Sequence, residues 1–397
     1  MQHYAGSRAV VVGGSIGGLT SALLLRKLGF TVDVFERTPT RLDHRGGGIV
    51  LQPITMKWFH GHSARQIQEL STKSSRLRYL GSGNEVVHEN AVEWRYTSWG
   101  TVYRALLSDF GDEHYHLGEY CAGFSQDADQ VELRFVSGRV ERADLVVFAD
   151  GISSTARRRL YPRLHREYSG YVGWRGTLRE DRATDETRAL LADSLTYSVA
   201  PNTHAVMYTI PGMNGELDDG KRLLNYVWYR NVADGPELQE LTTDIRGFEA
   251  PVSLPPGAVQ QRYVDAMKQA AAVQLAPAVA EVITRTEEPY LQVVFDTRIP
   301  GMADGRIAII GDAAFAARPH AAAGSAKAAA DAWALYEQLG AHTGGIVEAL
   351  KRWEPEQLGL GNRLIDRVST MGARSQFDNT WIPGDPDLRF GLYGPGE

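Results

Sequence analysis

The chain has 397 residues, 43% of them hydrophobic and 23% charged, which is typical of a globular protein with a large core divided into two or three domains. Its formal net charge of -6 gives no electrostatic reason to bind nucleic acid or an anionic membrane, so neither is expected as a partner. No apolar stretch reaches the roughly 18 to 20 residues that cross a bilayer and no secretory signal opens the chain, so we expect a cytoplasmic protein.

The first predicted unit is a βαβ motif. An apolar strand over residues 9–12 leads through the turn GGSIGG into a helix over 16–28, and a second strand covers 31–36. In such a turn Gly13 permits the bend, the backbone at Ser15 approaches a pyrophosphate, and Gly18 lets helix and strand pack closely. Glu36 ends the second strand, where an acid holds a ribose. The motif predicts a dinucleotide site, with a plain glycine turn and a solvated Glu36 as the alternative.

Two later apolar runs, over 144–149 and 306–311, are predicted as buried parallel strands like the first. The earlier run is followed by Asp150 and Gly151, which indicates a backbone that passes close to a ligand. The later one ends at Gly311 and Asp312, whose carboxylate is suited to sugar-like hydroxyls. The alanine-rich residues 321–339 predict a helix whose first N–H groups are free to face a partly negative ring edge.

The remaining segments predict a second architecture and a long final helix. Residues 167–297 contain alternating, aromatic-rich stretches, which favour an antiparallel sheet with one buried face. A last helix is expected over 344–371. The tail after Asn379 is broken by proline and glycine, so we expect an irregular arm.

These elements, in this order and spacing, resemble the single-component FAD-dependent aromatic hydroxylases, whose fold is typified by 4-hydroxybenzoate hydroxylase. The resemblance covers roughly residues 8–374 and is strongest to the 2,6-dihydroxypyridine 3-hydroxylase type, in GGSIGGLT, GGGIVLQP, GYVGWRG, RPHAAAGSAK and FGL. It implies an α/β fold: a Rossmann-like FAD-binding domain (1–166 and 290–345), an inserted antiparallel β-sheet substrate domain (167–289), and a C-terminal helix with an irregular tail (346–397).

The resemblance also implies which residues bind FAD. They are Gly13, Gly14, Ser15 and Gly18 at the pyrophosphate, Glu36 at the adenosine ribose, Arg37 against the adenine, Gly48, Ile49 and Val50 along the flavin ring, Asp150 in the aspartate–glycine motif, Gly311 and Asp312 at the ribityl chain, and Pro319, Ala323, Gly324 and Ser325 facing the flavin. The sequence departs from the family at Phe315, where many members have histidine. Near the phosphates Tyr103, with Arg104 beside it, occupies the place of an arginine.

The implied reaction is a hydroxylation. NADH or NADPH reduces FAD, oxygen adds at flavin C4a, and the hydroperoxide transfers one oxygen atom to an electron-rich ring, such as the hydroxypyridine 2,6-dihydroxypyridine. No second dinucleotide turn occurs in the sequence, so the nicotinamide cofactor is expected to bind transiently. A homodimer is expected because dimers are common in similar enzymes. Two alternatives stay open: a flavin dehydrogenase or oxidase on the same fold, and a flavin-binding protein without turnover.

The candidate catalytic residues are His320, Arg175 and Tyr208. His320 precedes the flavin-facing helix and is predicted to act as a base or a substrate contact, with a histidine that satisfies a loop carbonyl as the alternative. Arg175 is expected to stabilise an anionic ring oxygen or to pair with an acid. Candidates for the substrate pocket, for each of which plain core packing is the alternative, are His204, Tyr208, Trp228 and Tyr229, together with His320.

Other polar residues are expected to be structural. Lys327 lies one turn into the predicted helix, where it is expected to solvate the surface. Even if His60 and His62 share a strand face they lack a third ligand, so they are expected to be surface residues. The single cysteine, Cys121, excludes a thiolate cluster within the chain. No metal site is therefore predicted.

Overall fold

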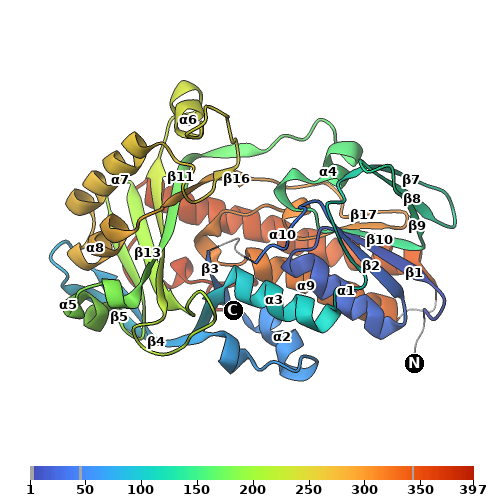
Figure 1. The fold of residues 1–397 in the computed structure, drawn as a ribbon, viewed down its shortest axis with the longest axis horizontal. Coiled ribbons are helices and arrows are strands. Elements are labelled where there is room, and N and C mark those ends of the chain that lie inside the picture. Colours follow the sequence, from blue (N-terminus) through green and yellow to red (C-terminus); the bar gives the residue numbers. More distant parts are fainter. Residues whose placement is uncertain (1–3, 44–46, 342–343) are drawn as a thin grey trace.

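The computed structural model describes residues 4–43, 47–341 and 344–397, and its two large sheets lie side by side along the long axis (Figure 1). The six-stranded sheet is parallel except for its edge strand β17. In spatial order it contains β17 (Ala303–Asp304), β18 (Ile307–Ile309), β10 (Leu145–Phe148), β1 (Arg8–Val12), β2 (Thr31–Glu36) and β6 (Tyr115–Leu117).

The predicted βαβ motif is confirmed. Helix α1 spans Ile16–Leu28, between β1 and β2, and it ends where Gly29 adopts a left-handed φ of 101°. Its buried face packs against α3 (Trp99–Phe110) and α9 (Gly324–Ala341). The predicted strands over 144–149 and 306–311 are found as the shorter β10 and β18. A 3-10 turn follows each of them, beginning at Gly151 after β10 and at Gly311 after β18.

The second sheet has nine strands and is larger than the sequence indicates. Three of its strands come from residues 48–98, and β12 pairs in parallel with β4, which joins them to the predicted antiparallel region. In spatial order the strands are β15 (Ser253–Leu254), β16 (Tyr290–Asp296), β11 (Glu167–Arg179), β14 (Leu223–Asn231), β13 (Thr203–Ile210), β12 (Ser194–Ala200), β4 (Thr72–Leu80), β5 (Val86–Ser98) and β3 (Gly48–Leu51).

The two faces of the nine-stranded sheet bury different cores. Because side chains alternate along a strand, Trp174 and Trp228 lie on one face, in the core formed with α7 (Gln261–Gln274) and α8 (Pro277–Arg285). The other face carries the aromatic residues Tyr171, Tyr208 and Tyr229, and it packs against the C-terminal part of the chain. The second face therefore points toward the six-stranded sheet and its helices.

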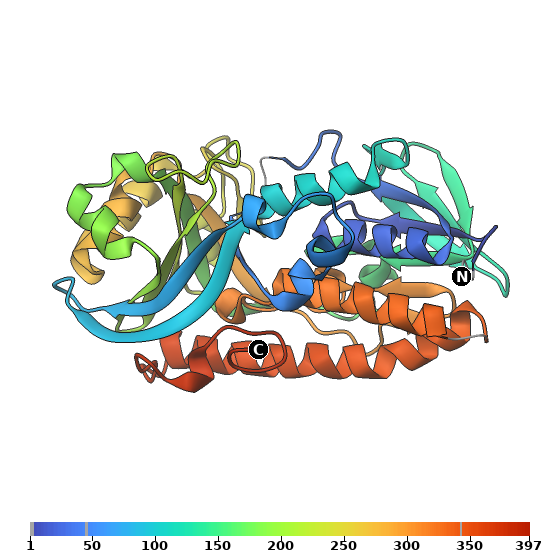
Figure 2. The same cartoon turned by 90° about the horizontal axis from the view of Figure 1, so that it is seen from below.

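The C-terminal helices connect the two sheets. Figure 2 shows α10 (Ile346–Gln376) running beneath both, with α9 beside it. Helix α9 starts later than predicted, because Pro319–Ala321 forms a 3-10 turn and Ala322 then adopts a left-handed φ of 50°. The tail packs as an irregular arm, with Trp381, Leu388 and Phe390 buried against the second face.

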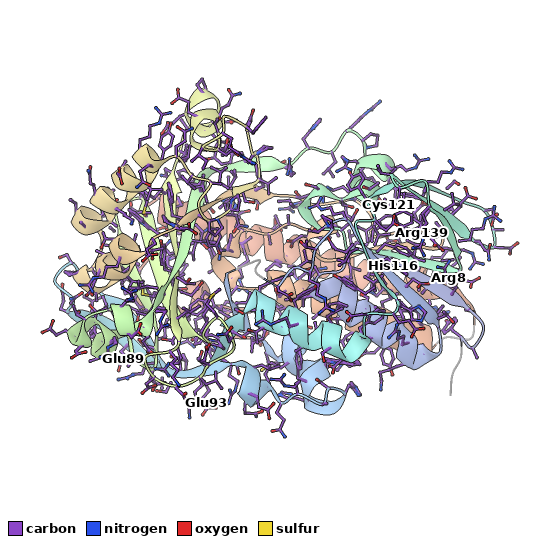
Figure 3. The ribbon with its side chains drawn as sticks, in the orientation of Figure 1. Arg8, Glu89, Glu93, His116, Cys121 and Arg139 are labelled. Atoms are coloured by element: carbon purple, nitrogen blue, oxygen red, sulfur yellow. The ribbon has the colours of Figure 1, made fainter. Side chains whose placement is uncertain are left out.

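The smaller elements complete the fold. A three-stranded sheet lies at the end of the molecule where Figure 3 labels Arg139 and Cys121; it comprises β7 (Cys121–Gln126), β8 (Val131–Phe135) and β9 (Val140–Ala143). The remaining helices are α2 (Pro53–Gly61), α4 (Thr155–Leu160), α5 (Asp185–Leu191) and α6 (Pro236–Leu241). His60 lies in α2 and His62 caps it; both are exposed, so they share no strand face and lie at the surface. No helix in the described ranges is both long and apolar enough to span a bilayer.

Candidate active site

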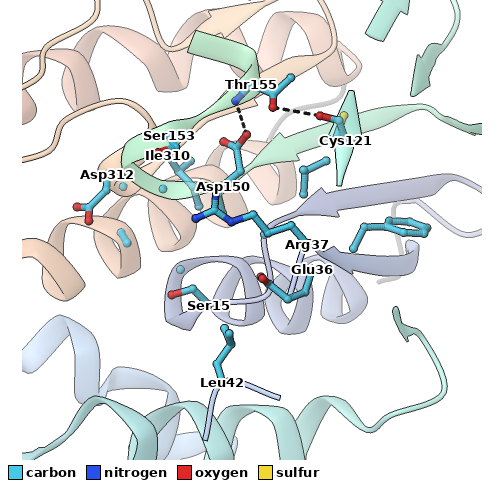
Figure 4. A pocket seen from close by; sticks show the side chains of 18 of the residues that line it. Ser15, Glu36, Arg37, Leu42, Cys121, Asp150, Ser153, Thr155, Ile310 and Asp312 are labelled. Carbon is cyan, nitrogen blue, oxygen red and sulfur yellow. Dashed lines mark hydrogen bonds between the residues drawn. The ribbon is translucent and has the colours of Figure 1, made fainter. Parts of the chain in front are cut away.

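A cleft opens where the carboxyl ends of β1, β10 and β18 meet, because parallel strands point their carboxyl ends to the same edge. It brings together corners that are far apart in the sequence (Figure 4). The predicted FAD-binding residues that line it are Gly13, Ser15, Glu36, Arg37, Asp150, Gly311, Asp312, Gly324 and Ser325. Leu42, Trp99, Cys121 and Thr155 also contribute to its walls.

The first corner needs glycine for physical reasons. Gly13 has a φ of 103°, and a Cβ there would lie 2.4 Å from the Ala149 carbonyl oxygen. A Cβ at Gly18 would lie 1.9 Å from the Gly13 carbonyl oxygen, so the helix approaches the strand as closely as the backbone allows. Ser15 is the residue before α1, and its side chain makes no capping hydrogen bond. The Ser15 hydroxyl and the first N–H groups of α1 thus face the cleft together, as an anion site requires.

Glu36 holds the same corner from the neighbouring strand. Its Oε2 accepts a hydrogen bond from the Gly14 N–H at 2.9 Å, and its Oε1 accepts one from the Thr38 N–H at 2.9 Å. The Gly14 carbonyl accepts from the Tyr115 hydroxyl at 2.9 Å. Gly14 therefore fixes the conformation of the turn and does not line the cleft. The Glu36 carboxylate does line the cleft, and it can still accept a hydrogen bond from a ribose hydroxyl.

Asp150 and Asp312 place two carboxylates in the cleft. Asp150 Oδ2 accepts from the Thr155 N–H at 2.7 Å, but its enclosed Oδ1 has no partner among the described residues. The Asp312 side chain projects into the open cleft. Desolvation raises the pKa of the Asp150 carboxyl, while hydrogen bonds from Ser154 and from the Thr155 N–H and the charge of Arg157 lower it in part. A buried acceptor without a donor is costly, so the cleft is suited to a ligand that brings hydroxyl groups.

The third corner is tied to helix α9 by a buried ion pair. Lys327 Nζ lies 2.5 Å from Asp331 Oδ1, and Asp331 Oδ2 accepts from the Gly311 N–H at 2.9 Å. Both side chains are fully enclosed. The expectation that Lys327 solvates the surface is therefore wrong, because its ammonium is enclosed between Asp331 and the Phe315 ring. The ion pair sets the position of Gly311, and with it Asp312, against the start of α9.

The cleft as a whole fits an extended dinucleotide such as FAD. One end offers backbone N–H groups at a helix start, the wall offers the Glu36 carboxylate, and the far end offers Asp312 beside Gly324 and Ser325 at the start of α9. An anionic pyrophosphate suits the first of these features and sugar hydroxyls suit the others. Pro319 and Ala323 adjoin this end without lining the cleft.

A second group of polar side chains lies where β3 begins. The Gly48 N–H donates to Asn225 Oδ1 at 2.8 Å, and a Cβ at Gly48 would lie 2.8 Å from the Tyr208 ring. Tyr208 stacks on Tyr96 with ring centroids 4.6 Å apart. Arg175 of β11 lies two strands away from Tyr208 of β13, on the same face of the sheet. Of the other predicted flavin-side residues, Ile49 is half-buried and Val50 lies in the core of this face.

His320 lies in a closed aromatic cluster. Its Nε2 is 2.7 Å from the Tyr171 hydroxyl, and its ring packs on Tyr229 with centroids 4.6 Å apart. His204 lies next to it, 5.3 Å between centroids, and hydrogen-bonds Ser375 of α10 through Nδ1. Burial lowers the pKa of His204 to about 3 and that of His320 well below its usual value, with His204 and Arg318 adding repulsion at His320. Both imidazoles are therefore neutral at physiological pH.

Trp228 does not join these residues. It lies on the opposite face of the sheet, where its indole N–H donates to Thr203 Oγ1 at 2.7 Å in the core under α7 and α8. Trp228 and Tyr229 are consecutive in one strand, so they cannot share a face. The prediction that Trp228 lines the pocket is wrong, and alternation along β14 is the signal that excludes it.

Sequence reasoning missed several polar residues of the site. Tyr171 contacts His320, Tyr290 lies opposite Arg175 in the register, and Asn225 binds the Gly48 N–H. The period of two along β11 places Tyr171 on the face of Arg175 and could have identified it. Tyr290 and Asn225 depend on strand pairing across long stretches of chain, which no local pattern reveals.

Models of known families match two parts of the chain. The model described as an NAD(P)-binding Rossmann-like domain matches residues 11–70, which include the glycine-rich corner. The model described as FAD binding domain-like matches residues 168–296, which include most of the aromatic face of the nine-stranded sheet. In the part of the chain that the structure describes, no group of three or more metal-ligating side chains comes together.

Relatives match nearly the whole length. A 2,6-dihydroxypyridine 3-monooxygenase of Paenarthrobacter nicotinovorans is 37% identical, covering 97% of this chain and 96% of that protein. A 6-hydroxynicotinate 3-monooxygenase of Bordetella bronchiseptica is 26% identical, with 97% and 94% covered. The solved 2,6-dihydroxypyridine-3-hydroxylase from Arthrobacter nicotinovorans has a TM-score of 0.91 at 36% identity, with 97% and 96% covered. Klebsiella pneumoniae HpxO, complexed with FAD and uric acid, shares the fold, with a TM-score of 0.76 at 20% identity and 95% and 90% covered.

Proposed function

Because the chain belongs to the family of FAD-dependent aromatic monooxygenases, we propose that it hydroxylates a hydroxypyridine, with 2,6-dihydroxypyridine as the first compound to test. The reaction consumes one ring C–H, NAD(P)H, a proton and O2, and it yields the ring hydroxyl, NAD(P)+ and water. The likeness to the dihydroxypyridine enzyme along almost the whole chain carries this proposal. The Arg175 guanidinium and the Tyr290 hydroxyl at Gly47, with the Tyr208 ring at Gly48, support it, because these groups suit a small polar ring.

The chain holds and shields the reacting groups. When bound, FAD would supply the redox and oxygen-transfer chemistry. The corner at Gly13 and Ser15 would hold its pyrophosphate, Glu36 the adenosine ribose and Asp312 the ribityl hydroxyls, while Gly324 and Ser325 would offer N–H groups to the ring edge. The aromatic face of the nine-stranded sheet would exclude water from the substrate space.

His320 is the proposed acceptor of a substrate proton. Its Nδ1 is buried and has no partner among the described residues, while Nε2 contacts the Tyr171 hydroxyl. Because the imidazole is neutral, its Nδ1 can accept a hydrogen bond and then the proton of a ring hydroxyl, although burial lowers its pKa and makes it a weak base. Replacing His320→Gln should therefore lower the yield of product per NAD(P)H by about tenfold or more, because general-base contributions are of that order or larger. NAD(P)H oxidation without substrate should stay normal, and an unchanged product yield would remove His320 from the mechanism.

The substrate proposal is tested by coupled assays on the purified yellow protein. NADH and NADPH are each supplied with 2,6-dihydroxypyridine, 6-hydroxynicotinate or 4-hydroxybenzoate under 18O2, and we expect the first to give a product one labelled oxygen heavier. A product without label would support a flavin dehydrogenase or oxidase instead. Bound FAD that neither nicotinamide cofactor reduces, with any ring present, would support a flavin-binding protein without turnover.

The assembly and the compartment are further parts of the proposal. A homodimer is proposed because dimers are common in similar enzymes, and the cytoplasm because NAD(P)H is supplied there. Light scattering on the FAD-loaded protein checks the first point, with twice the 43.8 kDa chain mass expected. Fractionation of the producing cells checks the second. A monomer at working concentrations would contradict the dimer without affecting the reaction.

A further inference from the structure

Arg175 is a half-buried cation on the aromatic face of the nine-stranded sheet, with no carboxylate beside it. It lies in the middle of β11, and no acidic residue in the described ranges comes within ion-pair distance of its guanidinium. Its Nε is enclosed and has no hydrogen-bond partner there. An isolated charge in the protein interior is strongly disfavoured unless an opposite charge compensates it. The arrangement therefore calls for an anion that the chain itself does not provide.

The polar heads around Arg175 converge on one small space. A Cβ added to Gly47 would lie 2.6 Å from the Tyr290 hydroxyl oxygen and 3.4 Å from both Arg175 Nη1 and Asn225 Oδ1. The glycine at 47 thus leaves open a point that the Arg175 guanidinium and the Tyr290 hydroxyl both reach, while the Asn225 atom nearest to it is the amide oxygen that already accepts the Gly48 N–H. The Tyr290 hydroxyl is buried without a hydrogen-bond partner among the described residues. This gives an O–H donor and a guanidinium that have no protein anion beside them.

The neighbouring phenols do not supply the missing charge. Tyr208, Tyr229 and Tyr290 face Arg175 from β13, β14 and β16. Burial raises the pKa of each, and Arg175 lowers it only in part, so all three stay protonated at neutral pH. The negative charge that pairs with Arg175 must then come with a ligand.

A cavity beside the cluster provides an approach for such a ligand. It has a volume of about 490 Å³ and extends from Tyr290 and Gly47 to exposed residues. Its charged lining residues are Arg104, Arg179, Arg182 and Arg285 against Asp43, Glu287 and Glu288. This wall carries more positive than negative groups, which favours the entry of a small anion.

We propose that Arg175 and Tyr290 form an oxyanion subsite, so that the enzyme binds its dihydroxylated N-heterocyclic substrate as the monoanion and discriminates against neutral rings. The inference rests on the proposed function, which it refines by specifying the ionisation state of the substrate. The Arg175 guanidinium and the Tyr290 hydroxyl, both directed at one ring oxygen, hold that oxygen anionic. A ring carrying that charge is more electron-rich, and thus more reactive toward an electrophilic oxygen. Tyr290 acts here as a specificity-determining residue.

The test measures ligand binding to the FAD-loaded protein, with the change in flavin absorbance as the readout. For the unmodified protein the Kd of 2,6-dihydroxypyridine should fall as pH rises, until the ligand is fully ionised. Arg175→Met should raise that Kd by about 100-fold at high pH and remove the pH dependence, because a hydrogen-bonded charge pair contributes on that order. The neutral ring 2,6-dimethoxypyridine should bind both proteins equally. A matched control is Arg230→Met, on the opposite face of the sheet with its guanidinium 5.0 Å from the Trp228 ring, which should leave both Kd values unchanged.

Two further variants keep the inference testable if Arg175→Met loses FAD or fails to fold. Arg175→Lys retains the charge and should keep the pH dependence with a weaker Kd, while Tyr290→Phe should raise the Kd of the anion by about tenfold. Binding that ignores pH in the unmodified protein, or an equal loss for the neutral ring in Arg175→Met, would overturn the subsite. If dihydroxypyridine is not a substrate but another ring anion binds in an Arg175-dependent way, the proposed function fails and the subsite stands.

Discussion

His204 and His320 show how single residues can make the protein sensitive to acid. They are 1% and 2% exposed, pack against each other and against Tyr229, and have no acidic partner among the described residues that would favour their charged forms. Desolvation is the main cause of the lowered pKa of both. The folded state therefore keeps both imidazoles neutral, whereas the unfolded chain protonates them near the ordinary value of about 6.5.

The first prediction concerns stability below neutral pH. Since the folded pKa of His204 is about 3, its contribution is fully present above pH 6.5 and is lost as pH falls toward 3. Between pH 7 and pH 5 this amounts to about 2 kcal/mol in the free energy of unfolding, and His320 adds a loss in the same direction. Urea unfolding of the native protein and of His204→Asn at both pH values measures it. The free energy of unfolding should differ less between pH 7 and pH 5 in the variant than in the native protein. An equal pH dependence in both proteins would contradict the assignment.

At the scale of elements, the Lys327–Asp331 pair connects helix α9 to the end of β18. The pair is enclosed, and Asp331 also accepts the Gly311 N–H, so removal of one charge leaves the other without compensation. Trp353 of α10 donates its indole N–H to the Asp331 carbonyl at 3.0 Å, which ties α10 to the same point. The position of the Asp312 carboxylate in the cleft depends on these contacts.

The second prediction tests this connection. Lys327→Met should lower the free energy of unfolding by about 3 to 5 kcal/mol, because it leaves a buried carboxylate unpaired. It should also weaken FAD binding, because Gly311 and Asp312 lose their support. The double variant Lys327→Met/Asp331→Asn removes the charge and keeps an acceptor for the Gly311 N–H, so it should recover part of both losses. Unfolding curves and FAD titrations measure the effects; a double variant no better than the single one would contradict the explanation.

The elements also show what the sequence could predict. The bounds of β1, α1 and β2 follow from local apolar periodicity and from the terminal Glu36. Gly29 also marks the end of α1, because it takes up a left-handed conformation that favours glycine. The three corners of the cleft could likewise be identified from glycines at strand ends. The addition of β3, β4 and β5 to the nine-stranded sheet could not, because strand partners distant in sequence leave no local pattern. For the same reason Arg175 was identified as a candidate while its companions Tyr290 and Asn225 were not.

The whole molecule is held together by the C-terminal part of the chain. Helix α10 contacts elements of both sheets, and the tail then folds back over the aromatic face. Trp381 is 6% exposed and stacks on His204 with centroids 4.6 Å apart. The arm therefore belongs to the core, although its sequence is rich in proline and glycine.

The third prediction concerns this arm. Trp381→Ala should lower the free energy of unfolding by about 3 to 5 kcal/mol, because it leaves a cavity beside His204. Tyr393→Ala on the same arm is the control: that side chain is 55% exposed, and its loss should change stability by less than about 0.5 kcal/mol. Thermal unfolding of the FAD-loaded proteins compares them. Equal effects of the two substitutions would show that the arm is not part of the cooperative unit.

The chain order of the six-stranded sheet has a consequence for biosynthesis. Its central strands β1 and β10 are translated early, but β18, which completes the cleft, follows only at Ile307, and the ion pair that supports it comes later still. A nascent chain on the ribosome thus has no complete FAD-binding cleft until most of the polypeptide has emerged. Flavin capture is then a late, post-translational event, and riboflavin-starved cells should accumulate full-length colourless protein that turns yellow when the vitamin is restored.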